Sequence, residues 1–148
     1  MGFLGKNFGR GADRAATADG PAKKAARTTR DQGNAAEDRA LAHLLAARLM
    51  LVERNYRTPG RGGGEIDLIM RERDGTLVFV EVRSRAGRGF GGAGGSIGAI
   101  KQQRVVLAAR HYLMRWPAPP PCRFDAVLVE GVGGGASIEW LRGAFDAG

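Results

Sequence analysis

The chain has 148 residues, a formal net charge of +8 and a hydrophobic fraction of 43%, which suffices for one modest core but not for two. Cys122 is the only cysteine, which excludes an intramolecular disulfide and a cysteine-based zinc cluster, and two histidines are too few for a histidine-rich metal site. The basic surplus favours polyanionic partners such as DNA or RNA, with an anionic membrane surface as the alternative. Charge alone does not distinguish an enzyme from a binding protein.

Residues 1–31 are rich in glycine, alanine, lysine and arginine and show almost no apolar periodicity after Phe8. Such a segment buries too little surface to offset its conformational entropy. We therefore predict a disordered basic arm over residues 1–31 and a folded domain over residues 32–148. The arm would contact phosphates, or it is a solvated tail without a specific role. Residues 1–10 lack the apolar core of a signal sequence, and we expect a cytoplasmic protein that does not bind membranes.

An apolar stripe predicts a first helix that begins near Asn34. Its members recur at spacings of three and four: Leu41, Leu44, Leu45, Leu49 and Val52. Asn34 is a candidate N-cap, with Glu37 three residues later as in a capping box. Glu37 also lies four residues before Leu41, so it projects from the face that packs inward. That is an uncommon place for a carboxylate.

Two segments after Gly64 predict a β-hairpin. Residues 65–71 alternate in polarity, and residues 76–83 have the β-branched and aromatic content of a central strand. The turn signal between them is Arg73-Asp74-Gly75. If these three residues form the loop, with Gly75 left-handed, the register places Asp67 directly opposite Glu81.

Two carboxylates that face each other repel, and a divalent cation bound to both removes this cost. A two-residue turn would instead place Asp67 opposite Val82. A further alternative is an edge strand on which Glu81 and Arg83 face water and form surface ion pairs. The pattern of the strands leaves these alternatives open.

Further elements follow the hairpin in the sequence. A glycine-rich loop over residues 86–95 leads to a helix over residues 96–114, which the prolines at 117–121 end. Strands are predicted over residues 123–130 and, more weakly, over residues 137–141. The order helix, hairpin, helix, strand, strand is typical of an α/β protein with helices packed on a mixed sheet.

The runs Gly64–Ile69 and Leu77–Arg85 resemble the bacterial YraN family. The similarity extends to motifs on both sides of the hairpin: Gly33 and Glu37, Asn55-Tyr56-Arg57, Lys101-Gln102, Tyr112-Leu113 and Arg123-Phe124-Asp125. It covers about residues 33–130. The YraN family is assigned to the restriction-endonuclease-like PD-(D/E)XK superfamily. The resemblance therefore implies a mixed β-sheet flanked by helices, similar to the core of Holliday junction resolvases.

The resemblance also implies a metal site. Asp67 and Glu81 would hold one or two Mg²⁺ (or Mn²⁺) ions, with the carbonyl of Val82 as an additional ligand. Glu37 matches the extra helical carboxylate of resolvase-like members. A ligand set made only of oxygen atoms suits Mg²⁺ or Mn²⁺ rather than zinc. Glu65 is a weaker candidate, whose simpler role is a salt bridge to Arg83.

Arg83 stands where the superfamily signature has lysine. An arginine stays protonated and cannot act as a base, but it can orient water or bind the transition state. Lys101 lies at the start of the packed side of the second helix. It either points at the same site and supplies the missing ammonium group, or extends to water. Asp125 either supports the site from behind or serves a turn or an edge strand.

We expect a metal-dependent endonuclease that hydrolyses phosphodiester bonds in DNA, including branched or damaged DNA. The candidate catalytic residues are Asp67, Glu81, Arg83, Glu37 and Lys101. The expected nucleic-acid contacts are Arg57, Arg61, Arg85, Arg88, Lys101, Gln102 and Arg104. The alternatives are a non-catalytic nucleic-acid-binding protein of the same fold and an interaction module of a larger complex, with a homodimer as a further candidate assembly.

Overall fold

The computed structural model describes residues 29–85, 97–131 and 137–147, and the structural statements below concern these residues. The elements follow one another as α1 (Thr29–Ala46), β1 (Met50–Arg57), β2 (Glu65–Arg71), β3 (Leu77–Arg85), α2 (Ala99–Leu113), β4 (Cys122–Glu130) and β5 (Ser137–Phe145). The predicted glycine-rich loop and nearly all of the predicted basic arm lie outside this part of the chain. Neither described helix is long and apolar enough to cross a membrane.

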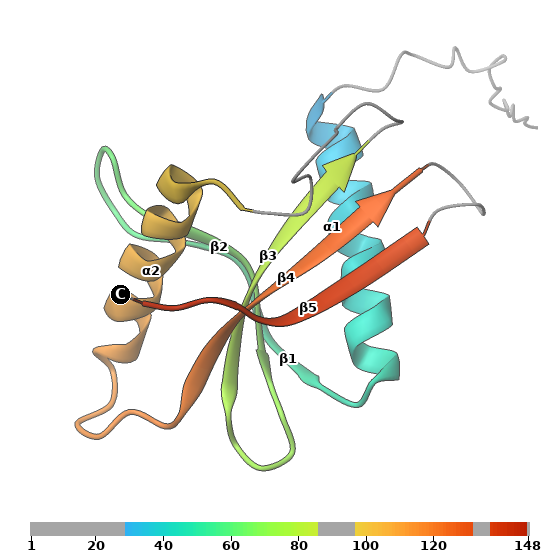
Figure 1. The fold of residues 1–148 in the computed structure, drawn as a ribbon. Coiled ribbons are helices and arrows are strands. Elements are labelled where there is room, and N and C mark those ends of the chain that lie inside the picture. Colours follow the sequence, from blue (N-terminus) through green and yellow to red (C-terminus); the bar gives the residue numbers. More distant parts are fainter. Residues whose placement is uncertain (1–28, 86–96, 132–136, 148) are drawn as a thin grey trace, which may run out of the picture.

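The strands of the described residues form one mixed sheet in the order β1-β2-β3-β4-β5 (Figure 1). Neighbouring strands are antiparallel except for β3 and β4, which are parallel. A parallel pair needs a crossover connection, and α2 lies within that connection. The predicted α/β class is confirmed. The strand with the strongest β-branched and aromatic content, β3, is the central strand, as predicted.

The two helices lie on opposite faces of the sheet (Figure 1). Helix α1 packs against a core that contains Val78 and Val80, whereas α2 packs against a core that contains Leu77 and Phe79. Successive side chains of a strand point to opposite faces, so β3 contributes to both cores. The sheet is therefore rigidly held at its centre, and the ends of β2 and β3 are fixed in place by packing on both sides.

Helix α1 begins earlier than the apolar stripe predicted. It starts at Thr29, so the prediction of Asn34 as an N-cap in a capping box is wrong. An apolar stripe marks only the part of a helix that packs, and an established helix extends by a further turn at little cost. Asn34 and Gly33 consequently lie inside the helix.

Helix α1 also ends earlier than predicted, because the chain turns at Arg48. This residue has φ 74°, and the N–H of Leu49 donates to the carbonyl of Leu44 at 3.1 Å, as in a Schellman motif. The usual sequence signal for that motif is glycine, which is absent here. The prediction that Leu49 and Val52 continue the helix is wrong. Because these residues were assigned to the helix, β1 was not predicted from the sequence.

The turn between β2 and β3 is the predicted three-residue loop. The N–H of Glu72 donates to the carbonyl of Thr76, and the N–H of Gly75 donates to the carbonyl of Glu72, both at 2.9 Å. Gly75 has φ 96°, which only glycine adopts without strain. The two-residue alternative is therefore wrong. The edge-strand alternative for Glu81 is also wrong, because β3 is central.

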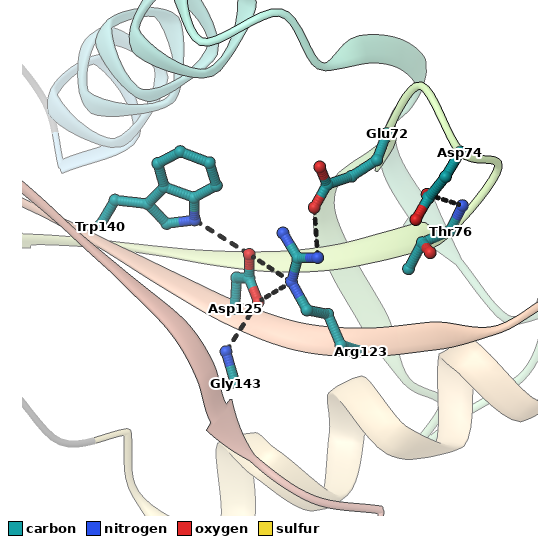
Figure 2. A network of polar contacts seen from close by, with 7 residues as sticks. All are labelled: Glu72, Asp74, Thr76, Arg123, Asp125, Trp140 and Gly143. Carbon is teal, nitrogen blue, oxygen red and sulfur yellow. Dashed lines mark hydrogen bonds and ion pairs between the residues drawn. The ribbon is translucent and has the colours of Figure 1, made fainter.

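A buried polar network joins β4, β5 and the hairpin turn (Figure 2). Asp125 is 0% exposed and accepts hydrogen bonds from Arg123 Nε at 2.9 Å, Trp140 Nε1 at 2.9 Å and the N–H of Gly143 at 3.0 Å. Arg123 also forms an ion pair with Glu72. The register of β4 and β5 is interrupted at Asp125, and its carboxylate accepts an N–H of the irregular β5 strand. These contacts give Asp125 a structural role.

Replacing Asp125 with alanine should lower the free energy of unfolding by about 3–5 kcal/mol, because Arg123 and the Trp140 indole would lose a buried acceptor. Urea denaturation followed by tryptophan fluorescence and circular dichroism measures the change. Glu139→Ala on the exposed side of β5 is the matched control and should stay within about 0.5 kcal/mol of the wild type. A loss below about 1 kcal/mol for Asp125→Ala would contradict the structural role.

Candidate functional site

The candidate site lies where β2 and β3 stop pairing. Their ladder ends at the pair of Leu68 and Val80. One residue further, the register brings Asp67 to face Glu81. The Asp67 carboxylate accepts a hydrogen bond from the N–H of Val82 at 2.8 Å, so a side chain replaces the backbone carbonyl of a regular ladder. Two acidic side chains thus meet across the hairpin, as the three-residue loop predicted.

Both of these carboxyl groups are hard to ionise. Glu81 is 3% exposed, and burial raises its pKa to about 8, with a further contribution from the negative charge of Asp67. Burial also raises the pKa of Asp67, although the hydrogen bond from Val82 opposes this shift. Glu81 Oε1 is buried and has no hydrogen-bond partner among the described residues. A buried acceptor of this kind is costly unless a ligand or cation binds it.

Glu37 reaches the same region from α1. Its side chain is 13% exposed, as expected for a carboxylate on the packed face. Burial raises the pKa of Glu37, and the charge of Asp67 raises it further. The guanidinium of Arg54 opposes the shift, with Nη2 3.5 Å from Glu37 Oε1. Glu37 therefore lies within electrostatic reach of Asp67, and its Oε1 has no hydrogen-bond partner in the described part of the chain.

A hollow of about 390 Å³ lies between α1 and the ends of β1 and β2. Its lining is mostly polar and contains three acidic side chains, those of Glu37, Glu65 and Asp67, against one basic side chain, that of Arg57. Such a lining attracts cations. Over residues 29–85, 97–131 and 137–147, however, no three acidic, histidine or cysteine side chains are already gathered as a metal-binding group.

A second hollow, of about 300 Å³, adjoins Glu81 and is lined by the positively charged Arg83 and Lys101 together with Ser84. Lys101 Nζ lies 3.4 Å from Glu81 Oε2, and its charge counteracts the rise in the pKa of Glu81. The structure thus brings Lys101 to the carboxylate pair. The alternative in which its ammonium group simply extends to water is wrong.

Glu65 has an ion-pairing role at the start of β2. Its carboxylate lies 3.7 Å from Arg57 Nε, 3.8 Å from Lys101 Nζ and 3.9 Å from Arg104 Nη2. Lys101 therefore stands between Glu65 and Glu81. This ammonium group links the carboxylate pair to a cluster of cations on the neighbouring surface.

The close approach of β2 to α2 depends on Gly64. A Cβ atom at this position would lie 2.1 Å from the carbonyl oxygen of Arg104 and 2.6 Å from the backbone nitrogen of Ala108. Only glycine therefore allows α2 to bring Lys101 to the start of β2. In the sequence Gly64 stands out only as the first residue of the run Gly64–Ile69, and the requirement for glycine here arises only from the packing.

The structure describes the positions of two of the remaining predicted nucleic-acid contacts, Arg61 and Gln102. Arg61 is exposed in the connection between β1 and β2. Gln102 Nε2 donates a hydrogen bond to the carbonyl of Ile97, just before α2, at 2.8 Å, so Gln102 stabilises the first turn of that helix. Arg88 and the side chain of Arg85 lie outside the described residues.

In the absence of a divalent cation, the free energy of unfolding should fall as the pH rises from about 5 to about 8. The folded protein keeps a proton on Glu81 up to about pH 8, whereas the unfolded chain releases it near the ordinary pKa of 4.5. The stability that this proton confers is therefore lost as the pH rises through the folded pKa. Urea denaturation in EDTA at several pH values measures the profile.

Glu81→Gln is the control for this profile, because glutamine has no proton to release and the curve should flatten. Mg²⁺ or Mn²⁺ should restore stability near pH 8 to the wild type but much less to Glu81→Gln. A wild-type profile that is already flat over this range would contradict the raised pKa of Glu81.

Comparisons with known proteins agree with the motifs. The sequence profile of the uncharacterised protein family UPF0102 matches residues 36–129. A UPF0102 protein of Acidovorax sp. (strain JS42) is 68% identical over 147 residues, which is 99% of each chain. A UPF0102 protein of Paracidovorax citrulli (strain AAC00-1) is 73% identical over 121 residues, 82% of this chain and 87% of that protein. The chain belongs to the uncharacterised protein family UPF0102, the YraN family that its motifs predicted.

Proposed function

We propose that the chain is a metal-dependent endonuclease that hydrolyses phosphodiester bonds in DNA on a restriction-endonuclease-like fold. The observation that carries the proposal is the pair formed by the half-buried Asp67 and the buried Glu81 at the end of the central hairpin. Two facing carboxylates destabilise a folded chain, because each raises the free energy of the other's charged form. Strongly shifted carboxyl groups in a hollow are typical of functional sites.

The available donors suit a hard divalent cation. Asp67 and Glu81 offer carboxylate oxygens, and Glu81 Oε1 is buried without a partner among the described residues. Neither hollow is lined by a thiol or an imidazole among the described residues, and oxygen donors favour Mg²⁺ or Mn²⁺. We assign the carbonyl of Val82 as an additional ligand. Glu37 would complete the set by moving its side chain toward Asp67.

A cation bound to this pair would supply the Lewis acidity that activates a water and stabilises charge on the phosphate. The chain's own side chains have separate roles in this proposal. Asp67 and Glu81 fix the position of the cation. Lys101 holds an ammonium group 3.4 Å from Glu81, where it would orient the attacking water and stabilise the transition state. Arg83 lines the same hollow and, because it stays protonated, would bind the phosphate rather than remove a proton.

The surroundings of the pair support the same proposal. The acidic residues lie at the end of a hairpin in the middle of a mixed sheet that has a helix on each face. In one adjoining hollow acidic side chains outnumber the single basic one, Arg57, and in the other two basic side chains accompany Glu81. The first arrangement favours a cation and the second favours a phosphate group, which is what phosphodiester hydrolysis with a metal requires.

The purified full-length chain should cleave DNA in Mg²⁺ or Mn²⁺ and not in EDTA. Asp67→Ala and Glu81→Ala should each lower the cleavage rate by at least about 100-fold, because each removes a proposed metal ligand. Single-stranded, duplex and branched DNA and an RNA of matched length are the substrates, and the products are resolved on denaturing gels. Both variants should still bind nucleic acid in EDTA.

Glu139→Ala is the matched acidic control, since this residue is exposed on β5 and belongs to neither hollow. Its cleavage rate should equal that of the wild type. Cleavage that survives in Asp67→Ala, or that persists in EDTA, would point to a contaminating nuclease and contradict the proposed site.

Lys101→Met should lower the cleavage rate by about 100-fold or more, because it removes the positive charge that would lie beside the reacting phosphate. The double variant Lys101→Met with Arg83→Lys should recover part of this loss, since it places an ammonium group on β3, two residues from Glu81. Single-turnover rates at saturating enzyme measure both effects. No loss in Lys101→Met would exclude the proposed role of this residue.

A non-catalytic nucleic-acid-binding protein is the second candidate function, and the presence of Arg83 in the signature position favours it. Such a protein would bind nucleic acid with a steep dependence on salt and without a metal requirement. Failure to cleave any of the substrates above, with salt-sensitive binding intact, would select this candidate.

A further inference from the structure

Three cations from two elements gather around the carboxylate of Glu65. Arg57 comes from the end of β1, whereas Lys101 and Arg104 lie one turn apart at the start of α2. Their nitrogen atoms lie 3.7, 3.8 and 3.9 Å from the Glu65 oxygens. Lys101 Nζ also lies 3.4 Å from Glu81, so the group adjoins the carboxylate pair. We refer to Arg57, Lys101, Arg104 and Glu65 as the Glu65 cluster.

The contacts of the Glu65 cluster are ion pairs rather than hydrogen bonds, because each distance exceeds 3.5 Å. The side chains of Arg57, Lys101 and Arg104 are 71%, 39% and 46% exposed, whereas that of Glu65 is 24% exposed. Two guanidinium groups and an ammonium group have far more N–H donors than two carboxylate oxygens can accept. Charge therefore draws the three cations toward Glu65, and many of their donors stay accessible from solvent.

A phosphate group has the properties that these donors require. It carries negative charge and several acceptor oxygens, and arginine binds it with the same paired geometry that it uses for a carboxylate. The Glu65 carboxylate marks the point on which the three cations converge. An incoming phosphate would meet cations that already face the same place.

We infer that Arg57, Lys101 and Arg104 form a binding site for a backbone phosphate of a nucleic acid, with Glu65 as the positioning residue. The bound phosphate is a neighbour of the one that is cleaved, because Lys101 contacts both Glu65 and Glu81. This last step rests on the proposed function. Phosphate binding by the cluster itself does not require cleavage.

Glu65 has two opposite electrostatic effects on such a site. Its negative charge weakens the attraction between the cations and a phosphate, so by charge alone its removal would strengthen binding. Its ion pairs also restrict three long side chains, which reduces the conformational entropy that they lose when they bind. We assign the larger effect to this restriction, so Glu65→Gln should weaken phosphate binding, whereas net charge alone would strengthen it.

Binding of labelled oligonucleotides to the full-length chain in EDTA tests the site without cleavage. Arg57→Ala and Arg104→Ala should each weaken binding about 5–10-fold and reduce the slope of log K against log salt by about 1. Arg110→Ala is the matched control. It removes an exposed arginine from the other end of α2, where its guanidinium contacts the carbonyl of Ala147, and should change binding less than about 2-fold.

Separate arms with single-stranded DNA, duplex DNA and RNA identify the source of the phosphate. An equal loss of affinity in Arg110→Ala would show that the basic charge acts as a whole and would overturn the cluster as a site. Unchanged affinity in both Arg57→Ala and Arg104→Ala would overturn it as well. Binding through the cluster without cleavage in Mg²⁺ or Mn²⁺ would reject the proposed endonuclease and leave the phosphate site standing.

Glu65→Gln tests the positioning role. Its affinity for the oligonucleotide should fall about 3-fold although the net charge rises by one, and Glu65→Asp, which keeps the charge, should recover part of the loss. Thermal unfolding of both variants checks that the fold persists. Binding by Glu65→Gln that equals or exceeds that of the wild type would overturn the role of Glu65.

Discussion

The hydrogen bond from the Val82 N–H to the Asp67 carboxylate is the contact on which the arrangement of the site depends. It replaces a backbone pair at the end of the hairpin and holds the half-buried Asp67 next to the buried Glu81. Burial raises the pKa of both groups, and the charge of Asp67 raises the pKa of Glu81 further; Lys101 offsets only part of this cost. The cores on both faces of β3 keep the strands in place and prevent the two acids from separating.

The charges around this pair are divided in space. Glu37 and Glu65 line one hollow together with Asp67, whereas Arg83 and Lys101 line the other next to Glu81. Under the proposed function, this division gives a polynucleotide a direction of approach. The phosphate would enter on the basic side, and the cation would be held toward the acidic side. Repulsion from Glu37 and Asp67 would disfavour a phosphate deep in the first hollow, whereas Arg57 at its lining belongs to the cations that would bind a neighbouring phosphate.

Sequence reasoning succeeded where a local signal fixed the geometry. Gly75 marked the left-handed position of a three-residue loop, and counting back from that loop placed Asp67 opposite Glu81. It failed at Arg48, which adopts a left-handed conformation without the glycine that would have signalled the end of α1. The contacts of Glu65 could not be predicted, because they depend on how closely α2 approaches Gly64. Long-range packing of that kind leaves no periodic pattern in the sequence.

The arginine at position 83 is less of an obstacle to catalysis than the strand motif suggests. What the chemistry would need is a positive charge at a fixed place beside the buried carboxylates, and the spacing of residues along β3 is only one way to supply it. Helix α2 supplies such a charge through Lys101, whose position is determined by Gly64 and by the ion pair with Glu65. With an ammonium group from the helix and a guanidinium from the strand, Arg83 can serve phosphate binding alone. The strand motif and the helix must therefore be considered together, since neither contains the whole set of charges.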